Sequence, residues 1–248
     1  MLAIETKKLT KKFKTKTAVS ELDLAVNEGE LFALLGVNGA GKTTTIRMLS
    51  CLSKPTEGKC YVCGSDCVSQ SGEVKSIIGI SPQDTAVAGN LTVLENLKLI
   101  CGIYGYSSDK TADRIANITR LFSMDEVKDS LAKTLSGGWK RKLSIAMALI
   151  SEPKVLFLDE PTLGLDVLAR RELWKVVQSL KGKITIVLTT HYMEEAEQLS
   201  DRIAIMIDGK IAALGTLSEL EQQSGETGLE NVFVKIAGEL GKGVGADE

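Results

Sequence analysis

The residues best suited to chemistry in this 248-residue chain form the loop Gly36-Val37-Asn38-Gly39-Ala40-Gly41-Lys42-Thr43. An apolar run precedes the loop and helically spaced apolar residues follow it, so we expect it to join a strand to a helix. Glycines let backbone N–H groups close around a phosphate, and the following helix directs its positive end at the same oxygens. Lys42 is expected to reach the β- and γ-phosphates, and Thr43 to bind Mg²⁺. A plain glycine-rich turn would not require Lys and Thr there, so the loop predicts a nucleoside-triphosphate site.

Three more polar residues stand where apolar runs end. Asp159 and Glu160 follow the run 155–158, and His191, the only histidine, follows 184–190. Open parallel sheets bind ligands at the carboxyl ends of their strands. Because neighbouring residues project in different directions, we expect Asp159 to hold Mg²⁺ and Glu160 to take a proton from an attacking water. A lone histidine at a strand end is more often structural, but beside these groups we expect His191 to donate to a γ-phosphate oxygen.

A second anion-binding helix start is expected at Ser136-Gly137-Gly138, ahead of an apolar helical segment. The pattern is weak alone, because Ser-Gly-Gly is usually only the beginning of a helix. With the first loop, it gives the chain two phosphate cradles.

The elements that must position these residues fall into three groups. Residues 2–9 and 17–26 alternate as antiparallel strands around a lysine-rich turn, and short apolar runs at 31–35, 77–80, 155–158 and 184–188 predict buried parallel strands. Between Gln83 and Leu135 only helices are expected: one opened by a Thr92/Glu95 capping box, one at 109–122 and a short one at 125–130. We therefore predict an α/β fold, a P-loop NTPase core with a parallel sheet, an N-terminal antiparallel β subdomain and an α-helical insertion subdomain at about 86–150. Residues 1–237 form one domain, and 238–248 are expected to fray.

Composition excludes several classes of protein. Hydrophobic residues make up 44% of the chain and charged residues 25%, enough for a globular core. A net charge of −2 argues against a nucleic-acid partner, and the lysines between positions 7 and 16 are expected to be solvated. Without a bilayer-length apolar run or a signal peptide, we expect a cytoplasmic location.

The cysteines suggest a metal site only weakly. Cys60-x-x-Cys63 followed by Cys67 has zinc-like spacing, but Cys60 and Cys63 fall on a short strand and point to opposite faces. We expect free thiols instead.

Taken together, these motifs resemble the ATP-binding subunit of ABC transporters over nearly the whole chain. The Walker A loop is 36–43, Walker B is 155–159 with Glu160, the signature is 135–139, the Q-loop residue is Gln83, the D-loop is 163–166 and the switch residue is His191. The resemblance implies ATP and Mg²⁺ as ligands. It also implies that Phe13 stacks on adenine, that Gln83 touches Mg²⁺ and the attacking water, and that Asp166 acts across a dimer interface.

The expected site can now be stated in full. The residues expected to contact the nucleotide are Phe13, Gly36, Asn38, Gly39, Gly41, Lys42, Thr43, Thr44, Ser136, Gly137, Gly138 and Asp166. Catalysis is assigned to Glu160, His191 and Gln83, and magnesium binding to Thr43, Gln83 and Asp159.

The resemblance also implies partners. Two such subunits, identical or different, would pair head to tail, so that Ser136 of one meets the γ-phosphate held by the other. The helical insertion would dock on an integral membrane permease, which places the chain at the inner face of the membrane. The segment 189–197 looks most like exporters of the bacterial drug-resistance and sodium-efflux type.

Two other functions remain as alternatives. The first is a soluble ABC ATPase of translation or DNA maintenance; a single cassette without heptad repeats disfavours it. The second is a regulatory ATP binder, which the presence of both Glu160 and His191 disfavours. Two positions depart from the family pattern: Trp139 replaces the usual Gln of the signature, and Phe13 a frequent Tyr. The bulky ring of Trp139 is expected to affect dimer packing or turnover.

Overall fold

The computed structural model describes residues 1–243, and its centre is a mostly parallel sheet of order β10-β9-β3-β8-β7-β6. Its strands are β3 (Leu31–Leu35), β6 (Ile78–Ser81), β7 (Val155–Asp159), β8 (Thr185–Thr190), β9 (Arg202–Ile207) and β10 (Lys210–Gly215). All neighbours are parallel except β10, which returns antiparallel to β9 through a turn at Asp208 and Gly209. The expected parallel sheet is confirmed.

A second, antiparallel sheet has the order β2-β1-β4-β5, and it confirms the predicted N-terminal β subdomain. Its strands are β1 (Leu2–Phe13), β2 (Lys16–Asn27), β4 (Glu57–Val62) and β5 (Ser65–Asp66). The first two strands are longer than expected. Lys11 and Lys12 belong to β1, because they pair with Val19 and Thr17 of β2. The connecting turn is therefore shorter than the lysine-rich turn that the sequence indicated.

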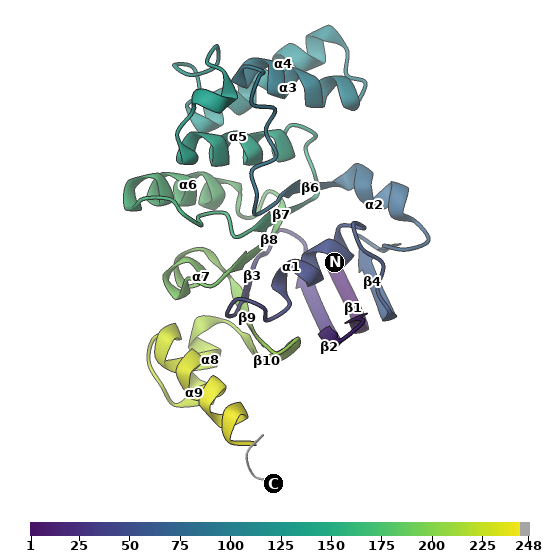
Figure 1. Ribbon diagram of the computed structural model, residues 1–248, viewed down its shortest axis with the longest axis vertical. Helices are drawn as coiled ribbons and strands as arrows, with labels where there is room; N and C mark the ends of the chain where they lie inside the picture. The colour runs from purple at the N-terminus through teal and green to yellow at the C-terminus, as the bar shows by residue number, and fades with distance from the viewer. Residues whose placement is uncertain (244–248) are drawn as a thin grey trace.

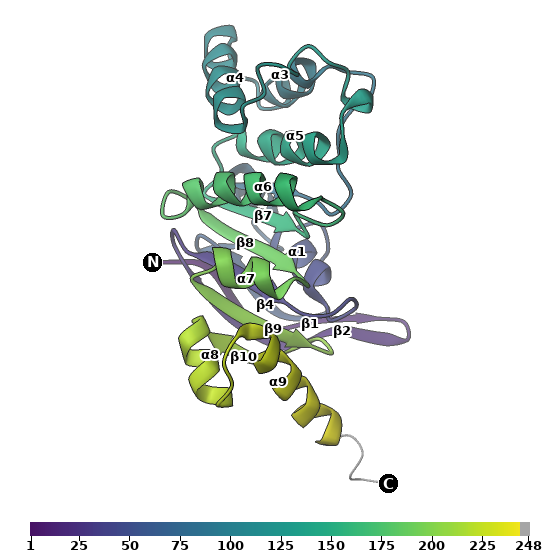
Figure 2. The ribbon, with the colours of Figure 1, turned by 90° about the vertical axis from the view of Figure 1, so that its left-hand side faces the viewer.

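The parallel sheet lies between two layers, and β3 shows why. Its residues are all buried, but Leu31, Ala33 and Leu35 pack in the core under α5, α6 and α7. Phe32 and Leu34 point the other way, into the core shared with the antiparallel sheet and α1. A strand buried on both faces needs the continuous apolar sequence found here. Figures 1 and 2 show α6 and α7 on one side of the central sheet and the antiparallel strands on the other.

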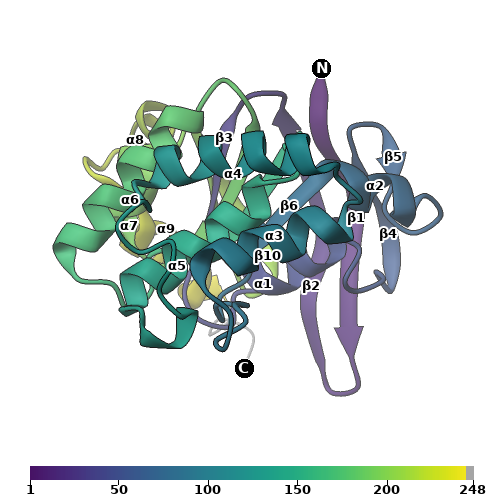
Figure 3. The ribbon, with the colours of Figure 1, turned by 90° about the horizontal axis from the view of Figure 1, so that it is seen from above.

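The helical insertion forms a separate lobe above the sheet (Figures 1 and 3). It contains α3 (Val93–Ile103), α4 (Ser108–Phe122), the 3-10 turn Ala132–Thr134 and α5 (Gly137–Leu149). The Thr92/Glu95 capping box opens α3 as predicted. The short helix expected at 125–130 is wrong, because this segment forms turns. Its carbonyls at Lys128 and Ser130 instead accept the N–H groups of Leu94 and Val93, which start α3.

The remaining helices connect the strands and extend the lower end of the molecule. They are α1 (Lys42–Leu49), α2 (Ser71–Ile77), α6 (Val167–Leu180), α7 (Met193–Leu199), α8 (Leu217–Ser224) and α9 (Leu229–Gly243). The sequence analysis did not predict α2. Helix α9 includes residues 238–243, which had been assigned to a frayed tail, and 244–248 lie outside the described residues. Among residues 1–243, no helix is both long and apolar enough to span a bilayer.

Candidate active site

The loop between β3 and α1 has the backbone that its glycines require. Gly41 precedes α1 with a φ of 105°, in the left-handed region that favours glycine. A Cβ there would lie 2.4 Å from the carbonyl oxygen of Ala18, and one on Gly36 2.4 Å from that of Met206. These distances are too short for any side chain. The loop therefore adopts a path closed to other residue types, with the N-terminus of α1 beneath it.

Lys42, the first residue of α1, is buried inside this loop. Its Nζ donates to the carbonyl oxygens of Gly36 (2.7 Å) and Val37 (3.2 Å). It also forms an ion pair of 3.1 Å with Oε1 of Glu160. Only about a twentieth of each side chain is exposed. A buried cation thus rests between the loop and the Glu160 carboxylate.

Asp159 and Thr43 meet at the end of β7. The Thr43 hydroxyl donates to Oδ1 of Asp159 at 3.1 Å, and the Thr189 hydroxyl contacts the same oxygen at 2.5 Å. Thr189 was not predicted as a site residue. Its signal was present in the sequence, as a polar residue near the carboxyl end of β8 and two positions before His191.

Glu160 turns away from Asp159 because its own backbone leaves the strand. Its φ is 49°, and its N–H donates to the Thr189 carbonyl (3.1 Å) and hydroxyl (3.0 Å). The second carboxylate oxygen, Oε2, lies 2.6 Å from Nδ1 of His191. The structure therefore brings Lys42, Glu160 and His191 into one line of contacts, with the carboxylate in the middle.

A cavity of about 470 Å³ opens beside this line. It is lined by Phe13, Lys16, Ala18, Asn38, Gly39, Ala40, Gly41, Lys42, Thr43, Thr44, Gln83 and Glu160. Most of the residues predicted to bind the nucleotide are therefore brought together, although Gly36 lies beneath the loop. Phe13 is 55% exposed, and Lys11 Nζ lies 5.4 Å from the ring centroid. Phe13 thus presents an exposed aromatic face beside a loop that is shaped to hold phosphate. A purine base can stack on such a face.

Asp159 and His191 contact residues of the cavity without lining it, and four of the residues predicted to bind the nucleotide lie on other surfaces. Ser136 is exposed at the start of α5, where its hydroxyl accepts the N–H of Trp139 at 3.4 Å, and Gly137 and Gly138 follow it. Asp166 caps α6 by accepting the N–H of Ala169 at 2.9 Å. Within a single chain, the helix start at Ser136 and the carboxylate of Asp166 therefore lie on surfaces away from the nucleotide cavity.

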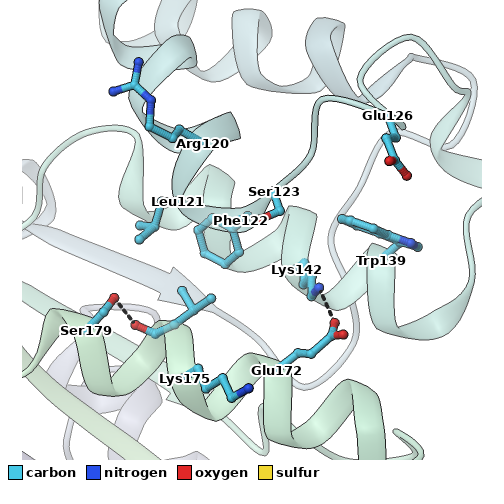
Figure 4. Close-up of a pocket in the computed structure, with 11 residues that line it drawn as sticks. Arg120, Leu121, Phe122, Ser123, Glu126, Trp139, Lys142, Glu172, Lys175 and Ser179 are labelled. Atoms are coloured by element: carbon cyan, nitrogen blue, oxygen red, sulfur yellow. Dashed lines mark hydrogen bonds and ion pairs between the residues drawn. The ribbon is translucent and has the colours of Figure 1, made fainter.

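Trp139 lies on the wall of a different pocket, of about 720 Å³, between α4, α5 and α6 (Figure 4). Lys142 Nζ is 4.4 Å from its ring centroid and forms a 2.8 Å ion pair with Glu172 of α6. The hydrogen bond to Lys142 lowers the pKa of Glu172. The unusual ring of the signature therefore packs on its own chain, beside an ion pair that joins the helical lobe to the core.

Arg141 is a functional candidate that the sequence analysis missed. Its guanidinium donates to the carbonyl oxygens of Pro82 (2.6 Å), Gln83 (2.6 Å) and Glu160 (3.3 Å). Burial lowers its pKa, and only 3% of the residue is exposed. The signal was a pair of basic residues on a helix face that is otherwise apolar. One side chain of the signature helix thus contacts the Q-loop and the backbone of Glu160.

Glu195 of α7 lies fully buried behind the site. The indole Nε1 of Trp174 donates to its Oε1 at 3.1 Å. Burial raises the pKa of this carboxyl, while Thr190, Trp174 and Thr162 oppose the shift and the charge of Glu160 adds to it. The folded chain therefore favours the protonated form of Glu195 more than the unfolded chain does.

Comparison with known proteins agrees with this geometry. Residues 19–163 match the family model described as ABC transporter. The chain is 39% identical over 239 residues to the probable multidrug ABC transporter ATP-binding protein YbhF of Escherichia coli, covering 94% of this chain but 41% of YbhF. It is 42% identical over 224 residues to the daunorubicin/doxorubicin resistance ATP-binding protein DrrA of Streptomyces peucetius, covering 90% and 68%.

A solved structure supports the same assignment. The dimeric, post-hydrolysis ATP-binding cassette MJ0796 bound to ADP and Pi superposes with a TM-score of 0.78 at 27% identity, covering 86% of this chain and 98% of that one. With a matching family model over more than half of its length, the chain belongs to the ABC transporter family.

Proposed function

We propose that this chain is an ATP-hydrolysing subunit that dimerises on ATP and drives export through a separate membrane permease. One observation carries the proposal: the loop cavity contains a phosphate cradle and a positioned carboxylate, whereas the second cradle at Ser136 is exposed elsewhere. A second copy, or a related subunit, can supply the missing cradle.

The residues present fit a magnesium-bound triphosphate. Thr43 Oγ1 and Asp159 Oδ1 lie 3.1 Å apart, and hydroxyl and carboxylate oxygens are the ligands that Mg²⁺ prefers. These two would hold the ion, with Gln83 on the cavity wall as a third oxygen donor. Bound Mg²⁺ neutralises charge on the phosphate oxygens. The loop amides and Lys42 bind the phosphates, and the face of Phe13 is open to the adenine ring.

The ion pair between Lys42 and Glu160 indicates the order of events in catalysis: the triphosphate binds first, and Glu160 then acts as the base. Without a phosphate, Lys42 neutralises the carboxylate that is to act as the base. When the triphosphate enters the loop, its oxygens compete for Lys42, and Glu160 is freed to accept a proton from water. His191 holds the other carboxylate oxygen at 2.6 Å and so fixes the direction in which Glu160 points. Substrate binding therefore prepares the base.

The exposed signature accounts for dimerisation. Ser136 and Gly137 are both exposed at the N-terminus of α5, an end that attracts anions. A second subunit placed head to tail would set this end against the γ-phosphate in the partner's loop, with Asp166 near the same interface. The γ-phosphate then joins the two chains, and its hydrolysis releases them.

An apolar groove supports a membrane partner. It has a volume of about 370 Å³ and lies between β6, α3 and α5, near the end of α1. Ile103 and Leu52 on its walls are 71% and 59% exposed. We assign this groove to an apolar cytoplasmic segment of the permease, which holds the subunit at the inner face of the membrane.

The type of transport follows from the relatives. The names of YbhF and DrrA refer to multidrug transport and drug resistance. The chain spans less than half of YbhF. The activity of the whole YbhF protein is therefore applied to this chain only as part of the proposal. Export of a drug is the activity that these names favour.

The test is ATP hydrolysis by Glu160→Gln. Gln keeps the shape of the side chain but cannot accept the proton, so we expect Mg-ATP to bind while turnover falls at least about tenfold. Size-exclusion chromatography with ATP should show the variant accumulating as a dimer. The control is Glu57→Gln, an exposed change on β4 that should leave turnover unchanged. Hydrolysis near the wild-type rate in Glu160→Gln would rule out the assigned base.

A further inference from the structure

Three cysteines meet at the C-terminal end of α1, outside the ATP site. Cys51 follows α1, Cys60 lies in β4, and Cys67 directly follows β5. Tyr61 pairs with Asp66 and Val62 with Ser65, so the next pair along this hairpin is Cys60 and Cys67. The N–H of Cys67 donates to the carbonyl of Cys60 at 3.0 Å, as this register requires. Directly opposite residues place their side chains on one face, with Cβ atoms about 4.5–5.5 Å apart.

The thiols of Cys60 and Cys67 point from this hairpin toward α1, because both donate to carbonyls of its last turn. Cys60 Sγ donates to the carbonyl of Met48 at 4.0 Å, and Cys67 Sγ to that of Leu49 at 3.5 Å. Cys67 also interacts with the thiols of both Cys60 and Cys51. Its hydrogen bond lowers the pKa of Cys60, and the same contact raises the pKa of Cys67. Cys67 is therefore the central thiol of the three.

The three thiols differ in access to solvent. Cys60 and Cys67 are 1% and 4% exposed, whereas Cys51 is half-buried. A small oxidant from solution therefore meets Cys51 first. Metal binding does not account for the cluster, because within residues 1–243 no group of three His, Cys, Asp or Glu side chains is arranged to hold an ion.

We propose that these thiols form an oxidation site, in which a hydroperoxide oxidises Cys51 and a disulfide between Cys60 and Cys67 is the product. Burial raises the pKa of Cys51, so only the deprotonated fraction of this thiol reacts. In the first step its thiolate attacks a peroxide oxygen, the O–O bond breaks and hydroxide leaves. Cys67 then attacks the sulfenic sulfur of Cys51; the S–O bond breaks, and the released hydroxide takes the Cys67 proton as water. This forms a Cys51–Cys67 disulfide.

The last step is thiol–disulfide exchange. The Cys60 thiolate, opposite Cys67 in the hairpin, attacks Cys67 Sγ and expels Cys51, which takes up the proton. In total two thiols are oxidised and one hydrogen peroxide is reduced to two waters. The product replaces both S–H donors at the end of α1, the helix that starts with Lys42. The site therefore lies at the base of the helix that binds phosphate, and it does not depend on the proposed transport function.

The test uses the full chain and hydrogen peroxide as the probe. Intact mass should fall by about 2 Da, the two hydrogens lost on forming a disulfide, and dithiothreitol should restore it. Peptides digested without reduction should link Cys60 to Cys67. A final link between other cysteines, or no disulfide at all, would overturn the proposal.

Variants separate the entry thiol from the product pair. Cys51→Ser should form the same link at least about fivefold more slowly, because the buried thiols must then meet the oxidant themselves. Neither Cys67→Ser nor Cys67→Ala should form the link. Two substitutions are used so that a folding defect in one of them does not decide the test. Cys63→Ser is the matched control, a half-buried thiol in the same hairpin, and should react at the wild-type rate. A wild-type rate in Cys51→Ser would contradict the assigned entry point.

Discussion

At the scale of single residues, the site consists of carboxylates with different neighbours. Asp159 is contacted by hydroxyls from Thr43 and Thr189, which fix the orientation of its carboxylate. Glu160 has a cation on one oxygen and an imidazole on the other. The two acids are adjacent in sequence, but the left-handed backbone of Glu160 separates their directions. A metal ligand and a base can therefore follow each other in the chain.

Glu195 provides a residue-scale prediction about pH. Its pKa in the unfolded chain is near 4.5, and burial raises it in the folded state. The folded protein holds this proton more firmly, so wild-type stability is lost as pH rises from about 4.5 through the folded-state pKa. Glu195→Gln does not titrate. The free energy of unfolding of Glu195→Gln should therefore increase relative to that of wild type as pH rises from about 5 to about 8.

Urea unfolding of both proteins across this range measures the difference. The other titratable groups are the same in both proteins, so their contributions cancel in the difference between the two free energies of unfolding. Glu194→Gln, an exposed neighbour on the same helix, is the control and should show no such trend. A difference between Glu195→Gln and wild type that does not vary with pH would mean that the folded and unfolded states bind this proton equally.

The sequence was sufficient for residues whose role depends on a local pattern. The loop glycines, Asp159, Glu160 and His191 stand at or just after strand ends, and Lys42 starts the helix that follows the loop. The parallel sheet brings these strand ends together. The sequence alone was insufficient to predict the roles of Thr189 and Arg141. Their contacts depend on which strands are neighbours and on how α5 packs across the Q-loop, which are properties of the tertiary structure.

At the scale of elements, α5 connects the helical lobe to the catalytic edge. Its exposed N-terminus carries Ser136, and one turn later Arg141 reaches the carbonyls of Pro82 and Gln83 and the backbone of Glu160. A movement of α5 when a partner binds Ser136 would therefore displace the Q-loop and the base together. The helix provides a direct mechanical connection between dimerisation and chemistry.

Arg141→Met tests this connection. The change leaves three carbonyls without a charged donor, so we expect the free energy of unfolding to fall by about 2–4 kcal/mol. Because Glu160 and Gln83 lose a positioning contact, kcat should fall at least about tenfold while ATP affinity changes less than about threefold. Lys140→Met removes the same charge from the adjacent position and should retain turnover. An equal loss of kcat and affinity in Arg141→Met would indicate a merely structural role.

The apolar groove gives a second prediction at this scale. Ile103→Lys places a charge at its most exposed apolar wall, which should weaken the docking of an apolar permease segment about tenfold or more. ATP hydrolysis by the isolated subunit should not change, because Ile103 is outside the nucleotide cavity. Co-purification with membranes from the native host measures the first effect. Val234→Lys, also exposed and apolar but on α9, is the control.

At the scale of the whole molecule, the order of elements was predictable and several boundaries were not. Apolar runs identified four strands of the parallel sheet, β3, β6, β7 and β8, because strands buried on both faces are apolar throughout. Helix α2 was missed because its seven residues bury only Val74 and leave no apolar stripe to recognise. The turns at 125–130 were read as a helix because their charges resemble a solvated helix face, whereas their carbonyls bind the start of α3.

The most demanding whole-molecule prediction concerns the composite site. Lys42→Ala removes the buried ammonium from the loop, so it should lose ATP binding and turnover. Ser136→Arg places a bulky cation on the second cradle; it should abolish ATP-dependent pairing of two copies of this chain while sparing ATP binding to the single copy. Size-exclusion chromatography with and without ATP, together with nucleotide-binding titrations, distinguishes these two defects.

Mixing the two variants then decides whether the site is shared. In a mixed dimer one site contains both substitutions, whereas the other combines the intact loop of the Ser136→Arg chain with the intact Ser136 of the Lys42→Ala chain. Neither variant should pair with itself on ATP, so the dimers that form are mixed. Each has one intact site of two, and activity should return to at most about half of wild type. A site completed within one chain would be damaged in every molecule. The mixture would then be no more active than its components, and the head-to-tail arrangement would be excluded.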